Sequence, residues 1–222
     1  MFEPQLHRRH ESQQATVLTY TATTESTTED DLKRLAEQNG AKKFFLLQPT
    51  DILGGGDIVS EKLGTDSYER STFKGDGLIL EEAGSAGMIL SADCPTVVMV
   101  TRKGLVYILH CGRAALTPIY YGKIGWNIIS LAAEKIRDER DAIEGVSVHA
   151  GICAKHFRHD HEEARPLVQP FLKCSSKTLD TKNGWTLDLN KVKRESLAGW
   201  FNSDEIHLDG VCTHETDSLA SF

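Results

Sequence analysis

The stretch SADCPTVVMVTRKGLVYILHCGR, residues 91–113, decides the fold. Residues 96–100 and 105–109 are short, apolar and rich in β-branched side chains, and residues 102–104 between them end in glycine, as tight turns often do. The pattern predicts two buried antiparallel strands joined as a hairpin.

The expected register of this hairpin brings a thiol and an imidazole together. In an antiparallel pair, facing residues have position numbers with a constant sum, and a turn tip near Lys103 makes that sum about 206. Cys94 then faces Gly112, close to His110, and facing residues lie roughly 4.5–5.5 Å apart. Because Pro95 has no N–H to donate, regular pairing stops there and Cys94 lies at the mouth of the hairpin. Each residue type alone is more often a core group, but the two at one mouth favour a functional site.

The composition excludes several classes of function. The 222 residues carry a formal net charge of −7 without a Lys/Arg-rich stripe, so neither nucleic acid nor an anionic membrane is an expected partner. The polar N-terminus lacks a signal segment and no apolar run of about eighteen residues occurs, so we expect a cytoplasmic protein. Five cysteines without CxxC spacing argue against disulfides and leave thiols for packing, metal binding or catalysis. A small molecule is therefore the expected partner, and the oligomeric state is left open.

Strands and helices are mixed along the chain without a regular βαβ rhythm. We expect residues 1–16 to form a disordered tail and residues 17–222 to form a single α+β domain, a mixed-sheet sandwich with flanking helices. The expected helices are 28–40, 117–136, 162–172 and 190–200, and the expected strands include 43–47, 146–149 and 206–208. The triple glycine 54–56 is expected to be a flexible loop.

Several motifs resemble those of the laccase-domain family, once named multicopper polyphenol oxidoreductases and known chiefly as zinc-dependent purine nucleoside phosphorylases. Residues 91–95 resemble its Thr-Ala-Asp-Cys-x-Pro motif, and residues 110–116 resemble its His-Ala-Gly-Trp-Arg-Gly-Leu motif. The further matching blocks are 75–78, 149–157 and 210–213. The resemblance implies the laccase-domain fold, which is similar to that of certain cysteine hydrolases.

The resemblance also implies an activity and a set of site residues. It implies phosphorolysis of adenosine or inosine at a Cys/His zinc centre, with adenosine deamination as a side activity, so purine nucleoside and phosphate are the implied substrates. Cys94 and His110 are the implied metal ligands. The implied catalytic residues are Cys94, His110 and Asp93, and the implied substrate-binding residues are Gln48, Asp76, Arg113 and His149.

One departure from the family pattern leaves the metal in question. The family takes a further zinc-binding histidine from a Gln-Val-His-Gly motif, where residues 48–51 here read Gln-Pro-Thr-Asp, so that Thr50 stands in the ligand position. A catalytic zinc normally keeps three protein ligands. The candidates for a third ligand are Asp76, His149 and the histidine-rich segment 156–161.

Two other functions therefore stay open. Without a metal, His110 could activate Cys94 as a nucleophile, as in cysteine deamidases of similar fold, so a thiol amidase or deamidase is the alternative enzyme. The functional arginine that the family carries near its N-terminus also has no counterpart. The missing ligand and the missing arginine favour a third possibility, a binding protein without turnover.

Overall fold

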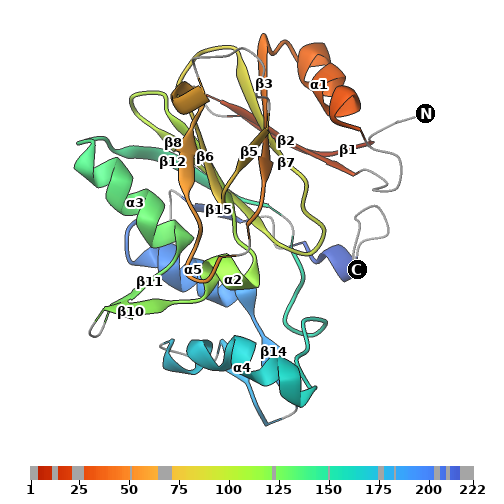
Figure 1. Ribbon diagram of the computed structural model, residues 1–222, viewed down its shortest axis with the longest axis vertical. Helices are drawn as coiled ribbons and strands as arrows, with labels where there is room; N and C mark the ends of the chain where they lie inside the picture. Colours follow the sequence, from red (N-terminus) through yellow and green to blue (C-terminus); the bar gives the residue numbers. More distant parts are fainter. Residues whose placement is uncertain are drawn as a thin grey trace.

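The structure is a computed structural model of the chain (Figure 1). It describes residues 5–11, 15–21, 28–50, 52–64, 72–121, 124–149, 151–174, 178–182, 184–202, 206–208 and 211–215. Residues 1–4 and 12–14 of the expected tail lie outside the described residues.

Two sheets form the centre of the molecule (Figure 1). The larger is mixed and has the strand order β15-β12-β8-β9-β6-β4, and the smaller is parallel with the order β5-β3-β7. The strands of the larger sheet are β15 (Ile206–Leu208), β12 (Ile143–Val148), β8 (Thr96–Thr101), β9 (Val106–His110), β6 (Gly77–Leu80) and β4 (Ile58–Ser60). Those of the smaller sheet are β5 (Thr72–Lys74), β3 (Lys43–Gln48) and β7 (Ser85–Ile89).

Alternation of side chains along the strands produces the layers. On β3, Phe44 and Leu46 pack on helix α1 (Glu29–Gln38), while Leu47 packs on the larger sheet. The other face of the larger sheet, which includes Met99, packs on α2 (Arg113–Leu116), α3 (Ile128–Asp138) and α5 (Leu189–Ala198). The order helix, small sheet, large sheet, helices confirms the predicted α+β sandwich.

The predicted hairpin is confirmed in its register. Thr96 of β8 faces His110 of β9, and Val98 faces Ile108, so the position numbers add up as the turn residues predicted. The first predicted helix is also confirmed, because Thr28 and Asp31 form the reciprocal hydrogen bonds of a capping box at the start of α1.

The N-terminal residues differ from expectation. Strand β1 (Gln5–Glu11) pairs antiparallel with β2 (Thr16–Thr21), with a register shift between Leu6 and Arg8. The prediction of a disordered tail over 1–16 is therefore wrong for residues 5–11 and for Thr16. Polar composition alone suggested fraying, but a neighbouring strand satisfies the backbone of this segment.

The long helix expected from Thr117 is also wrong in its first part. Thr117 ends α2, and strand β10 (Ile119–Tyr121) then pairs with β11 (Ile124–Trp126). Helix α3 begins only after Asn127, whose side-chain oxygen accepts hydrogen bonds from the backbone N–H groups of the first turn. The aromatic and β-branched residues ahead of Asn127 favour strands over the expected helix.

The helix expected over 162–172 is broken into short pieces. They are the 3-10 turn η3 (Glu162–Ala164), helix α4 (Arg165–Val168) and the 3-10 turn η4 (Gln169–Lys173), and a proline lies at the start of each of the last two. The remaining elements are η2 (Glu61–Gly64), β13 (Leu179–Asp180), β14 (Thr186–Leu187) and η6 (Thr213–Glu215). No helix within the described ranges has both the length and the apolar character to cross a bilayer.

Candidate functional site

Cys94 and His110 meet at the mouth of the β8–β9 hairpin. A Cβ atom added to Gly112 would lie 3.0 Å from the Cys94 Sγ and 3.1 Å from the His110 Nε2, so both groups close on the α-carbon of this glycine. The His110 ring is buried, whereas Cys94 is partly exposed. The hairpin thus sets a thiol at the solvent edge beside a buried imidazole, as the sequence predicts.

The carboxylate of Asp76 holds the far side of the His110 ring. Asp76 precedes β6 and is fully buried, and its Oδ1 lies 3.2 Å from the His110 Nδ1. Its Oδ2 accepts hydrogen bonds from the Thr50 hydroxyl at 2.9 Å and from the Gly56 N–H at 2.7 Å. The backbone N–H of His110 also donates to the backbone carbonyl of Asp76 at 2.8 Å. Contacts on both carboxylate oxygens fix the orientation of the imidazole.

Burial works against charge on this pair, but the hydrogen bonds outweigh it. For Asp76, burial alone would raise the pKa, yet bonds from His110, Thr50 and Gly56 lower it to about 2. For His110, burial alone would lower the pKa, yet Asp76 and then Cys94 raise it to about 9. Near neutral pH the pair is therefore carboxylate and imidazolium. A charged imidazole carries a proton on both nitrogens, so while Nδ1 faces Asp76, the Nε2–H is left on the side of Gly112, where the Cys94 Sγ also lies.

The last glycine of the triple-glycine loop 54–56 contacts the buried Asp76 carboxylate. A Cβ on Gly56 would lie 2.5 Å from the Thr50 Oγ1 and 2.6 Å from the Asp76 Oδ2, so only glycine lets this N–H reach Asp76. The Gly54 N–H donates to the Ala114 carbonyl at 2.9 Å, and the φ of Gly54 is +81°. The loop expected to be flexible is anchored to the site by hydrogen bonds. Sequence reasoning missed Gly56, although the rare run of three glycines was a signal of close approach.

Asp93 has a clear set of partners next to Cys94. Its Oδ1 accepts a hydrogen bond from the Thr213 hydroxyl at 2.7 Å, and its carbonyl accepts one from the Ile152 N–H at 2.9 Å. These contacts tie three distant segments of the chain together. The catalytic role of Asp93 stays a prediction.

The other predicted site residues are not joined to Cys94 by any described contact. The His149 Nε2 lies 3.0 Å from the Ser147 hydroxyl in the buried interior, and the Gln48 side chain is exposed at the end of β3. Burial and the charge of Arg113, which is partly exposed at the start of α2, lower the pKa of His159. The structure thus groups Asp76 with Cys94 and His110, and the substrate contacts of the remaining residues stay predictions.

The implied zinc centre can be tested against these residues. Thr50 uses its hydroxyl on Asp76, and a threonine offers no imidazole nitrogen. Within the described part of the chain, no third His, Cys, Asp or Glu atom joins Cys94 and His110 at mutual distances suited to one ion. The pair is one ligand short of a catalytic zinc set and does not by itself fit that metal.

A second group of potential ligands lies elsewhere. The ligand atoms of Cys153, His156 and Cys212 lie within 4.8 Å of one another, so this Cys-His-Cys cluster could bind a metal. Sequence reasoning placed His156 among the third-ligand candidates but missed the cluster. The spacing Cys153-x-x-His156 was a signal, whereas Cys212 is brought in only by the fold.

Comparison with known proteins identifies a matching family and a similar curated protein. Residues 21–222 match the sequence profile of the family described as multi-copper polyphenol oxidoreductase laccase. A purine nucleoside phosphorylase of Campylobacter jejuni is 26% identical over 152 residues, which are 66% of this chain and 60% of that protein. The chain thus spans 60% of the length of this curated relative.

Solved structures share the fold. YlmD from Geobacillus stearothermophilus superposes with a TM-score of 0.64 at 23% identity, over 86% of this chain and 72% of that chain. YfiH from Bacillus licheniformis superposes with a TM-score of 0.65 at 17% identity, over 86% of this chain and 73% of that chain. The protein NMB0706 from Neisseria meningitidis superposes with a TM-score of 0.59 at 15% identity, over 90% of this chain and 76% of that chain.

Proposed function

The chain belongs to the multi-copper polyphenol oxidoreductase laccase family, and from this premise we propose that it is an enzyme that cleaves purine nucleosides by phosphorolysis. The named activity of the Campylobacter jejuni relative supports the substrate class. The single observation that carries the proposal is the Asp76–His110–Cys94 arrangement at the hairpin mouth.

The reaction needs an acid near the leaving base. An oxygen of phosphate attacks the anomeric carbon of the ribose, the bond to the purine nitrogen breaks, and its electron pair stays on the base, which takes up a proton. His110, charged near neutral pH and aimed by Asp76, can donate that proton from Nε2. Arg113, partly exposed one residue after Gly112, is the proposed phosphate ligand.

A thiol amidase or deamidase is the second candidate, and one observation favours it. Cys94 is partly exposed beside an imidazole that is itself oriented by a carboxylate, which is the arrangement of an activated thiol nucleophile. Thr50 in the ligand position removes the argument that the cysteine must serve a metal.

The deciding experiment incubates adenosine and inosine with and without phosphate and follows the free base. Phosphorolysis predicts phosphate-dependent base release that falls at least about 100-fold in His110→Gln. The matched control Cys174→Ser, a cysteine outside the site, keeps wild-type release. No base release from either nucleoside contradicts the proposal. If no base is released, selective alkylation of Cys94 by iodoacetamide would support the thiol amidase or deamidase. Without selective alkylation of Cys94, the result would support a binding protein without turnover.

A further inference from the structure

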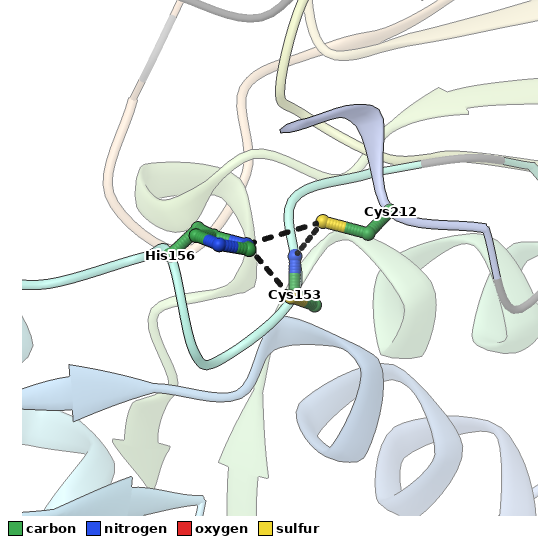
Figure 2. A group of neighbouring side chains, drawn as sticks. All are labelled: Cys153, His156 and Cys212. Atoms are coloured by element: carbon green, nitrogen blue, oxygen red, sulfur yellow. Dashed lines mark hydrogen bonds between the residues drawn. The ribbon is translucent and has the colours of Figure 1, made fainter. Parts of the chain in front are cut away.

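The turn after β12 presents two ligand types on one side. The His156 and Phe157 N–H groups both donate to the Cys153 carbonyl at 3.0 Å, which closes the turn. This turn sets the Cys153 Sγ 3.3 Å from the His156 Nδ1. The Cys-x-x-His spacing in this closed turn therefore places two potential metal-ligand atoms, one sulfur and one nitrogen, next to each other (Figure 2).

The third ligand type comes from the C-terminal segment. A parallel bridge pairs Gly151 with Cys212, and the Thr213 N–H donates to the Gly151 carbonyl at 3.4 Å. The Cys212 Sγ consequently lies 3.7 Å from the His156 Nδ1 and accepts a hydrogen bond from the Cys153 N–H at 3.3 Å (Figure 2). All three side chains thus point to a common centre.

The spacings match the edges of a coordination tetrahedron. With Zn–S bonds of about 2.3 Å and Zn–N bonds of about 2.0 Å, neighbouring ligand atoms lie roughly 3.5–3.8 Å apart. The S-to-N distances of 3.3 and 3.7 Å are close to these values. Neither cysteine forms a disulfide.

The surroundings hold the donors in place. The His156 ring stacks on His214 with centroids 4.0 Å apart and planes 11° apart, which fixes its orientation. The Glu215 Oε1 lies 3.8 Å from the His156 Nδ1 and pairs with the Lys155 Nζ at 3.1 Å. Cys153 and His156 are partly exposed, so a cation from solvent can reach the cluster.

We propose that Cys153, His156 and Cys212 form a binding site for a thiophilic divalent cation, zinc above all. Two thiolates and one imidazole are soft and borderline ligands, which favour zinc over magnesium or calcium. Two thiolates also balance the charge of the ion. The fourth position is left for water, with the Glu215 carboxylate as the nearest acidic group among the described contacts.

Such an ion would stabilise the two segments that contact Asp93 beside Cys94. Asp93, the residue before Cys94, is held by Ile152 and by Thr213, each of which adjoins one of the proposed ligands. A cation joining Cys153 to Cys212 therefore fixes the two segments that hold Asp93. The inference is independent of the reaction proposed above, because it concerns different ligands.

The first experiment measures bound metal in full-length protein that has been stripped and reloaded with zinc. The Cys94→Ser and Cys174→Ser proteins are expected to keep one zinc per chain, whereas Cys212→Ser and His156→Ala lose it. Bound zinc is measured directly, so the result does not depend on activity. Zinc that is lost in Cys94→Ser but kept in Cys212→Ser overturns the inference, and so does wild-type protein that binds none.

A second measurement uses wild-type protein alone, in case Cys212→Ser does not fold. Cobalt added in place of zinc is expected to give a thiolate-to-metal charge-transfer band. Bound zinc is expected to protect Cys153 and Cys212 from iodoacetamide, while Cys174 labels at the same rate with and without zinc. Absence of the band, or equal labelling of Cys153 with and without zinc, overturns the inference.

Discussion

The two groups of cysteine and histidine in this molecule, Cys94 with His110 and His156 with Cys153 and Cys212, differ in their surroundings. In one, His110 is buried between Asp76 and Cys94, and hydrogen bonds make the imidazole a charged donor. In the other, His156 is partly exposed, and its Nδ1 lies 3.3 Å from the Cys153 Sγ and 3.7 Å from the Cys212 Sγ. These different surroundings are the basis of the two roles proposed above, proton donation by His110 and cation binding by His156.

The largest effect is expected from Asp76→Asn, which breaks the first group and leaves the second intact. The Asp76 carboxylate accepts from His110, Thr50 and Gly56, and an amide NH₂ would face one of these donors without an acceptor. We expect the free energy of unfolding to fall by about 3–5 kcal/mol, measured by urea denaturation.

The matched control for that change is Asp138→Asn. The Asp138 side chain is 70% exposed on α3, so its loss of charge is expected to change stability by less than about 0.5 kcal/mol. Equal effects of the two substitutions would contradict the role given to the buried carboxylate.

The pH dependence of stability sharpens the contrast. Unfolded His110 titrates near 6.5 and folded His110 near 9, so its contribution is full below pH 6.5 and is lost as the pH rises through 9. We expect a loss on the order of 3 kcal/mol over that window, measured with a chelator present to keep the cation cluster empty. Asp76 contributes in the opposite sense, since its stabilisation is present above pH 3.8 and is lost as the pH falls through about 2.

Asp76→Asn is the internal check on this profile. With the carboxylate gone, stability should depend much less on pH between 6.5 and 9. A wild-type profile that is flat across this window, or one that Asn leaves unchanged, would rule out a charged His110 in the folded protein.

A smaller effect is expected from Gly56→Ala. The added methyl would press on the Thr50 hydroxyl and the Asp76 carboxylate, so we expect a loss of about 1–2 kcal/mol in thermal or urea unfolding. Gly145→Ala is the control, because a Cβ there meets nothing within 4 Å. If both changes are neutral, the glycine loop does not anchor the carboxylate.

Local sequence predicted the first group well and the second poorly. Strand patterning, the turn at 102–104 and Pro95 were enough to bring Cys94 beside His110, because one short hairpin connects them. The Cys212 partner of Cys153 comes from a parallel bridge between segments far apart in the chain, which no periodicity reveals.

The errors in secondary structure have a similar origin. Pro118 suits a helix start and a strand entry equally, and only the side-chain cap at Asn127 marks where the helix begins. The pairing of residues 5–11 likewise depends on a partner strand rather than on their own composition. The run of three glycines suggests a close approach, but only the fold shows that the Gly56 N–H donates to Asp76.

One sample tests the division of labour between the two groups most directly, namely the His110→Gln protein loaded with zinc. Its zinc content and its phosphate-dependent release of base from adenosine are measured side by side with the wild type. We predict one zinc per chain, as in the Cys94→Ser protein, together with base release at least about 100-fold below that of the wild type. Base release that persists, or zinc that disappears with His110, would contradict the assignment of acid chemistry to one group and cation binding to the other.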